Sequence, residues 1–157
     1  MKYRRVKLIG IGLGGVLLLA SSVHAADHKM ENVKEAKSGP APPMLPQGAK
    51  IEVLEGNPSG DALYTVRLKF PANYKVPAHS HPKDEHVTVI SGVLYIGMGD
   101  KLDPKLAKML TVGGFGLMPA NANHFAFTKA ETVILLHGIG PIEFKYVNPA
   151  DDPRNRT

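Results

Sequence analysis

The fold is decided by the stretch Ala78-His79-Ser80-His81-Pro82-Lys83-Asp84-Glu85-His86. Successive side chains of a β-strand point to opposite faces, so His79 and His81 share one face and can chelate a single metal ion. The three residues after His81 read as a turn, and Glu85 then opens a strand that can return its carboxylate to the same side. Farther along the chain, His124 stands at the start of a later strand. Three imidazoles and one carboxylate are a donor set suited to a first-row divalent ion.

Strand-like runs alternate with turn signals after the first third of the chain. The expected strands are 50–54, 63–70, 86–90, 93–96, 124–127, 133–137 and 142–147. Ser91-Gly92 reads as a tight hairpin turn between two of them. Asp103-Pro104, followed by Lys-Leu-Ala-Lys-Met-Leu, predicts one short helix with an N-cap and a proline at its first position. These patterns predict an all-β chain with one short helix, folded as a sandwich or a small barrel.

The spacing of these residues resembles the two sequence motifs of the cupin family. The first motif of the family, G-x5-H-x-H-x3–4-E-x6-G, is matched by His79-x-His81-x3-Glu85-x6-Gly92. The second motif, G-x5-P-x-G-x2-H-x3-N, is matched by Gly113-x5-Pro119-x-Asn121-x2-His124-x3-Thr128. A lone His-x-His pair is a weak signal, whereas the full first motif followed by the second is specific. The resemblance covers roughly residues 50–147.

The chain departs from these motifs at three positions, none of which is a metal ligand. Asn73 replaces the leading glycine, Asn121 replaces the glycine of the second motif, and Thr128 replaces its final asparagine. Asparagine adopts the left-handed backbone conformation more readily than most residues, so its use for glycine in a turn is mild. The departures therefore bear on the subfamily and not on the fold.

The resemblance implies a jelly-roll (cupin) β-barrel over 50–147, with one divalent metal ion at its centre held by His79, His81, Glu85 and His124. Fe²⁺ or Mn²⁺ is favoured, and Zn²⁺, Ni²⁺ or Cu²⁺ are alternatives with the same ligand preference. The resemblance also implies a homodimer. We expect a metal-dependent small-molecule oxidoreductase, dioxygenase-like in its reaction. The alternatives are a non-catalytic module that binds a metal or a metabolite, and a metal that only stabilises the barrel.

Two further histidines and one arginine could contribute to the site. His137 lies in the middle of a strand and is a candidate second-shell acid or base, although a histidine satisfied at the barrel edge has the same pattern. His86 follows Glu85 directly, so alternation places it on the opposite face, at the surface or an interface. Arg67 on an alternating strand is expected on the solvated face, and only an inward orientation would let it hold an acidic substrate.

The two ends of the chain differ from its middle. Residues 1–25 have a basic start, a short apolar run and small residues before Ala25, which predicts a signal peptide cleaved after Ala25. We therefore expect a periplasmic or secreted protein with no membrane segment after cleavage. Residues 26–49 are proline-rich and predict a disordered linker or N-terminal arm that could also cross to a neighbouring subunit. Residues 148–157 are expected to form a loose tail.

Charge and cysteine content exclude several classes of function. The whole chain carries a net charge of +5, but four of its 19 basic residues lie within the first 25. The remainder has 15 basic and 14 acidic residues, so a nucleic-acid partner is not expected. The absence of cysteine excludes disulfides, thiolate metal sites and a cysteine nucleophile.

Overall fold

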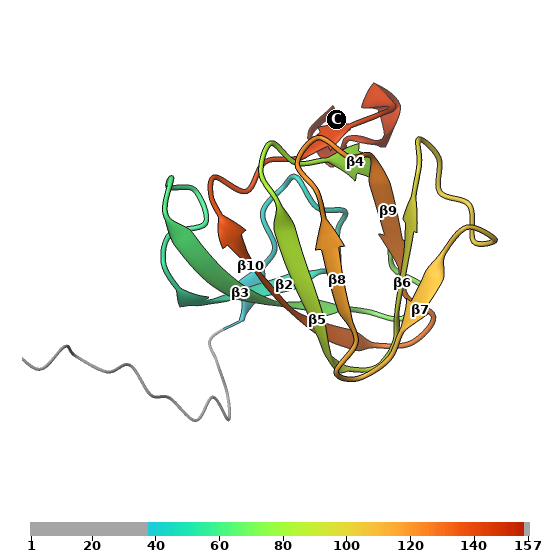
Figure 1. Cartoon of the computed structure of the whole chain (residues 1–157), viewed down its shortest axis with the longest axis horizontal. Coiled ribbons are helices and arrows are strands. Elements are labelled where there is room, and N and C mark those ends of the chain that lie inside the picture. Colours follow the sequence, from blue (N-terminus) through green and yellow to red (C-terminus); the bar gives the residue numbers. More distant parts are fainter. Residues whose placement is uncertain (1–37, 156–157) are drawn as a thin grey trace, which may run out of the picture. The chain divides into compact units, whose positions relative to one another are not determined.

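The structure, a computed structural model, describes residues 38–155, so the predicted signal peptide lies outside the described residues. The described strands form two antiparallel sheets (Figure 1). The six-stranded sheet has the order β1 (Gly39–Pro40), β2 (Lys50–Glu55), β3 (Leu63–Phe70), β10 (Thr132–Ile139), β5 (Glu85–Ser91), β8 (Phe115–Met118). The five-stranded sheet has the order β11 (Lys145–Tyr146), β4 (Lys75–Ser80), β9 (His124–Phe127), β6 (Leu94–Met98), β7 (Lys108–Leu110). This arrangement confirms the predicted all-β jelly roll.

The core lies between the inner faces of the two sheets. On β3, the buried Val66, Leu68 and Phe70 alternate with Arg67 and Lys69, as the period of two requires. Strands β5, β6 and β10 add buried apolar residues of their own. The main contributors from these strands are Val87, Val89, Leu94, Ile134 and Leu136. Burial of these branched side chains from both sheets supplies the main stabilisation of the barrel.

The prediction of a hairpin turn at Ser91-Gly92 is wrong, because the chain changes sheets there. Strand β5 pairs with β10 and β8, whereas β6 pairs with β7 and β9. Gly92 has φ of 77°, and a Cβ atom built on it would lie 2.4 Å from the carbonyl oxygen of Glu131. Glycine is needed here because both the backbone conformation and the close approach exclude a side chain.

The predicted helix after Asp103 is also wrong. The Asp103 carboxylate accepts a hydrogen bond from the amide of Lys105, and its carbonyl accepts one from the amide of Leu106. Asp103 therefore caps a turn as its sequence position predicts, but the turn does not continue into a helix. Residues Lys108–Leu110 then leave the turn and pair with β6 as strand β7. Pairing with a strand distant in sequence overrides the local helical preference.

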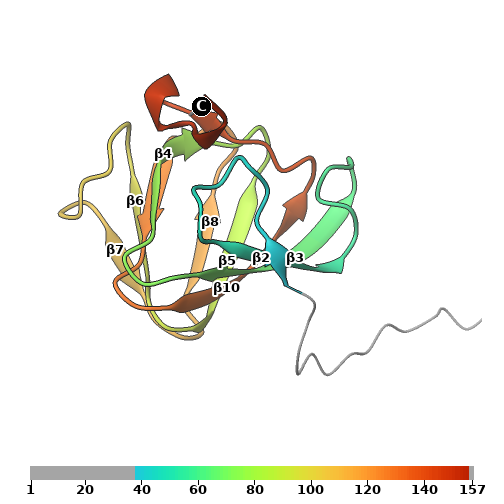
Figure 2. The same cartoon turned by 180° about the vertical axis from the view of Figure 1, so that it is seen from behind.

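Residues 38–49 differ from the predicted disordered linker, because they pack against the barrel. Strand β1 pairs with β2, and the amide of Ala41 donates to the carbonyl of Ala49. The segment between these residues loops back beside β2 (Figure 2). Leu45 and Ala49 are both buried. The prolines exclude regular structure as expected, but apolar burial still orders the segment; residues 41–46 are called the arm below.

The C-terminal segment is not the predicted loose tail as far as residue 155. Strand β11 is shorter than the predicted strand 142–147 and is followed by two 3₁₀ helices, η1 (Pro149–Asp151) and η2 (Pro153–Asn155). Asn148 caps η1 by accepting a hydrogen bond from the amide of Ala150. Arg154 donates to the carboxylate of Asp152 and to the carbonyl of Phe144. These contacts fix the tail to the segment that precedes β11.

The two asparagines that replace motif glycines adopt the backbone conformation that glycine favours. Asn73 has φ of 60° and Asn121 has φ of 61°. Both are left-handed conformations that asparagine tolerates better than most residues, so the departure from the motif preserves the turn. Within residues 38–155, no helix is long and apolar enough to span a membrane.

Candidate metal centre

Three histidines from two paired strands meet inside the barrel. His79 lies near the end of β4 with His81 just beyond it, and His124 opens β9, where it pairs directly with His79. One ring nitrogen from each of the three lies within 4.8 Å of the others. The exposed fractions are 3% for His79, 5% for His81 and 2% for His124. The alternation of His79 and His81 therefore brings both rings to one buried point together with His124; these three residues are called the histidine cluster.

Each ring of the histidine cluster is oriented by a backbone carbonyl. Nδ1 of His79 lies 2.7 Å from the carbonyl oxygen of Pro77, and Nδ1 of His124 lies 3.0 Å from that of Ala122. Nδ1 of His81 lies 2.6 Å from the carbonyl oxygen of Glu143. A carbonyl only accepts, so each Nδ1 carries the proton, and a neutral ring then has its lone pair on Nε2. Such a carbonyl contact is the usual outer support of a metal-binding histidine.

Glu85 faces the histidine cluster from the other sheet. It opens β5, is only 6% exposed, and its Oε1 atom lies 3.4 Å from Nε2 of His81. This distance is longer than a good hydrogen bond, so the contact is mainly electrostatic. Nε2 of His81 is accordingly a buried nitrogen without a hydrogen-bond partner among the described residues. A buried lone pair beside a carboxylate is the chemistry that a divalent cation satisfies.

The electrostatics of the metal-free cluster keep two rings neutral. Burial lowers the pKa of His79 well below 6.5, and the neighbouring His124 and His81 rings lower it further. Burial also lowers the pKa of His124, against smaller opposing contributions from the Ala122 carbonyl and Glu85. For His81, burial opposes the charged form most strongly, but Glu85 and the Glu143 carbonyl together outweigh it and raise the pKa. His81 is thus the ring of the cluster that takes up a proton most readily.

Aromatic side chains close the cluster on the side of β11. The ring of Phe144 stacks on His79 with a centroid distance of 4.5 Å and meets His81 edge-on at 4.6 Å. Tyr146 lies 5.8 Å from His79. Sequence reasoning missed Phe144 and Tyr146 as part of the site. Ile142, Phe144 and Tyr146 alternate, and this period of two was the signal that could have placed them on one face.

Two spaces lie inside the barrel, and Glu85 lines both of them. The inner pocket, about 40 Å³, is lined by His79, His124, Glu85 and apolar core residues. The outer cavity, about 260 Å³, lies between the arm, the inner face of the six-stranded sheet and the segment 142–144. Both spaces share walls formed by Leu45, Leu68, Glu85, Leu136 and Phe144. A ligand in the outer cavity would therefore lie next to Glu85.

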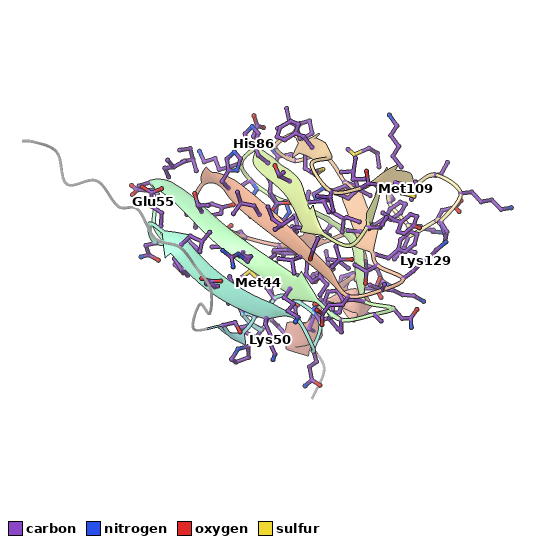
Figure 3. The ribbon with its side chains drawn as sticks, turned by 90° about the horizontal axis from the view of Figure 1, so that it is seen from below. Met44, Lys50, Glu55, His86, Met109 and Lys129 are labelled. Carbon is purple, nitrogen blue, oxygen red and sulfur yellow. The ribbon has the colours of Figure 1, made fainter. Side chains whose placement is uncertain are left out.

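His137 lies on the outer face of its sheet, away from the histidine cluster, which corrects the prediction that it serves the site as an acid or base. Leu136 and Gly138 are buried on either side of it, so alternation turns His137 to the outer face of the sheet. It pairs with His86 across β10 and β5, and the two rings stack at 5.0 Å with an interplanar angle of 5°. The outward placement of His86 agrees with its prediction (Figure 3). Arg67 also faces outward and lies 3.4 Å from the Glu52 carboxylate.

A jelly-roll barrel with a buried histidine cluster is the architecture of a cupin. In this class of proteins, such a cluster can bind a metal ion. Residues 37–143 match the family model described as the ChrR cupin-like domain. Because this match spans more than half of the chain, the protein belongs to that family of cupins.

Solved structures share this fold at low sequence identity. A proposed acetylacetone dioxygenase from Methylibium petroleiphilum PM1 has a TM-score of 0.62 and 17% identity, with 83% of this chain and 88% of that chain covered. The polyketide cyclase RemF from Streptomyces resistomycificus has a TM-score of 0.56 and 18% identity, with coverage of 83% and 87%. An RmlC-like cupin from Shewanella frigidimarina has a TM-score of 0.54 and 18% identity, with 71% of this chain and 89% of that chain covered. No curated protein is significantly similar in sequence.

Proposed function

We propose that the protein is a metal-dependent oxidoreductase that oxidises a small molecule with dioxygen, in the manner of a dioxygenase. One arrangement carries this proposal. The Nδ1 atoms of three buried histidine rings are hydrogen-bonded to backbone carbonyls, which leaves each Nε2 free to bind a metal ion. The buried Glu85 lies beside these rings and lines an apolar cavity. His79, His81, His124 and Glu85 would hold the ion, with Fe²⁺ or Mn²⁺ favoured. When bound, the ion supplies Lewis acidity and access to a second oxidation state.

The residues of the chain would orient the ligands and exclude water. The carbonyls of Pro77, Ala122 and Glu143 hold the rings in one tautomer, and Phe144 restricts the rotation of His79. The apolar walls of the outer cavity would exclude bulk water once a ligand fills the space between them. These features limit the motion of the donor set before any ligand arrives.

The scarcity of proton-transferring groups favours dioxygenation over hydrolysis or isomerisation. Glu85 is the only titratable side chain that lines the outer cavity within the described residues. His137, the other candidate acid or base, lies on the outer face of its sheet. A dioxygenase transfers both atoms of O₂ to one substrate, so the reaction balances without an external reductant. Hydrolysis and isomerisation would need a positioned acid or base.

One observation favours the second candidate, a non-catalytic module that binds a metal or metabolite. The inner pocket beside His79 and His124 measures about 40 Å³. A water molecule occupies about 30 Å³ in the liquid, so this pocket has room for little more than one small group. A protein that only binds one small ligand could use a pocket of this size as it stands, without any conformational change.

Turnover is tested with Fe²⁺-loaded and Mn²⁺-loaded protein and the oxidisable diketone acetylacetone, a catechol or a flavonol. We expect oxygen consumption that depends on the metal, and incorporation of both oxygen atoms from ¹⁸O₂ into one product. The variant His124→Ala should lose the activity together with the metal, whereas His137→Gln, on the outer face, should retain it. Stoichiometric binding of metal without oxygen consumption on any of these compounds would favour the binding module.

Export also belongs to this proposal. The basic, apolar and small-residue segments of residues 1–25 support it, and fractionation of cells that express the full chain tests it. The homodimer implied by the cupin resemblance stays a prediction, which sedimentation of the purified protein tests.

A further inference from the structure

We propose that the arm and the outer cavity select an uncharged, apolar ligand, and that the arm is a specificity-determining wall of the site. The inference deepens the proposed function, on which it rests for the role of the neighbouring metal centre. It concerns the part of the ligand that would lie away from the histidine cluster, in the space bounded by Met44, Leu45, Val53 and Ile142.

The arm is held in place by two tyrosines that belong to the barrel. The hydroxyl of Tyr146 donates to the carbonyl of Met44 at 2.7 Å, and the hydroxyl of Tyr74 donates to the carbonyl of Pro46. Leu45, which lies between these two anchors, is 7% exposed and lines both the inner pocket and the outer cavity. The arm is therefore held against the barrel, and its Leu45 forms part of the wall that the two spaces share. Tyr146 ties the arm to the strand that pairs with His79.

The walls of the outer cavity carry almost no charge. Eleven of its 13 lining residues are apolar, and the other two are Ser59 and Glu85. Neither lysine nor arginine lines it within the described residues, and Arg67 on the neighbouring strand pairs with Glu52 on the outer face. A carboxylate placed there would lose its hydration without gaining a cationic partner, and it would meet the carboxylate of Glu85. An uncharged ligand avoids both costs.

The volume of the cavity limits the size of the part of the ligand that it holds. An engineered protein cavity of about 150 Å³ binds benzene, so about 260 Å³ accommodates roughly ten non-hydrogen atoms. Val53 pairs with the fully buried Val66 and shares its inward face, but Val53 is 49% exposed. An inward-facing valine that remains half exposed marks the open end of the cavity. Ligands would enter at Val53 and end at Glu85.

The test compares two probes of equal size, uncharged methyl benzoate and anionic phenylacetate, by ligand-observed NMR and calorimetry. Measurements on metal-free protein isolate the cavity from the metal, and measurements on Zn²⁺-loaded protein add the ion without redox chemistry. In metal-free protein we expect methyl benzoate to bind roughly tenfold or more tightly than phenylacetate, because the carboxylate lacks a partner. Equal or tighter binding of phenylacetate would overturn the proposal, as would failure of both probes to bind.

Two substitutions at Val53 locate the binding. Val53→Trp should fill the open end of the cavity and weaken the binding of methyl benzoate roughly tenfold. Val53→Arg should supply a cation, so that the preference for methyl benzoate over phenylacetate narrows or reverses. Val112→Trp and Val112→Arg are the matched controls, because Val112 is 64% exposed and does not line the cavity. Thermal melts verify that each variant is folded. If the Val53 and Val112 variants bind the probes alike, the ligand lies elsewhere and the proposal is wrong.

The outcome separates this inference from the proposed function. Selective binding to metal-free protein with no metal uptake would support the cavity and reject the metal centre. Metal uptake without selective binding of the probes would support the metal centre and reject the cavity.

Discussion

Nδ1 of His81 donates a hydrogen bond to the backbone carbonyl of Glu143 at 2.6 Å, across 62 positions of sequence. This contact joins a ring of the histidine cluster to the segment that carries Phe144 and bounds the outer cavity. A proton fixed on Nδ1 leaves Nε2 as the lone pair that faces Glu85. The same segment thus orients a proposed metal ligand and forms a wall of the proposed ligand cavity, so the two proposed functions would depend on one piece of backbone.

Phe144 should contribute to both stability and metal affinity. Its ring is 9% exposed and stacks on His79, so Phe144→Ala should lower the free energy of unfolding by about 3 kcal/mol. Loss of this support should also weaken metal binding roughly tenfold, as for other outer-shell changes. The control Phe115→Ala, at a 56% exposed position, should cost less than about 1 kcal/mol. Urea denaturation and metal titration measure the two effects; equal losses in both variants would contradict the assignment.

Asn121 should be replaceable by glycine but not by a branched residue. Its φ of 61° lies in the left-handed region, where Asn121→Gly removes strain and should change stability by less than about 1 kcal/mol. Asn121→Val should destabilise the protein by about 2 kcal/mol, because a branched side chain disfavours that conformation. Thermal denaturation of the two variants checks the difference. A valine variant as stable as the glycine variant would show that the turn can adopt another conformation.

Removal of a tyrosine hydroxyl that holds the arm should loosen the arm without disturbing the barrel core. Tyr146→Phe removes the hydrogen bond to the Met44 carbonyl and should lower stability by about 1 kcal/mol while the ring stays packed. Hydrogen exchange should accelerate at Leu45, whose amide donates to the Pro42 carbonyl within the arm. Protection from exchange at Val66, in the centre of β3, should fall only as far as the global stability falls. Unchanged exchange at Leu45 would show that the hydroxyl does not hold the arm.

Acidification should destabilise the metal-free protein. The folded-state pKa values of His79 and His124 lie below 6.5, so their neutral forms stabilise the fold above that pH, and this contribution is lost as pH falls from 6.5 toward the folded values. His81 has a raised pKa and acts in the opposite sense, offsetting part of the loss. We expect the unfolding free energy to fall between about pH 7 and pH 5. The unfolding free energy should fall less over this pH range in His79→Gln than in the wild type, both measured with a chelator present. An equal dependence on pH in the two proteins would contradict this assignment.

The histidine cluster could be predicted because its geometry follows from local rules. Alternation places His79 and His81 on one face, and the motif spacing sets His124 at the start of a strand. The bounds of β3 also agree with the prediction, since Leu63–Phe70 alternates strictly and ends at a proline. Where the pattern of a strand is unambiguous, its inward face follows from the sequence.

The face of His137 could not be predicted, because its strand is apolar on both sides. In Val133-Ile134-Leu135-Leu136, alternation offers two apolar faces, and only the pairing with β3 and β5 decides which one is buried. The same limit explains Gly92 and Lys108–Leu110, whose conformations are set by strands far away in sequence. The arm was missed for a related reason. Its prolines exclude regular structure, but burial of Leu45 depends on a barrel that the local sequence does not describe.

We propose that His79, His81, Glu85 and His124 hold one divalent metal ion. Elemental mass spectrometry of residues 26–157, purified without a metal-binding tag, tests it beside the double variant Glu85→Ala, His124→Ala. A His86→Ala, His137→Ala variant, changed on the outer face, is the control. We expect about one metal ion per chain in the wild type and the control, with Fe or Mn favoured, and almost none in the double variant. Absence of metal from the wild type after reconstitution, or equal metal in all three proteins, would contradict the account.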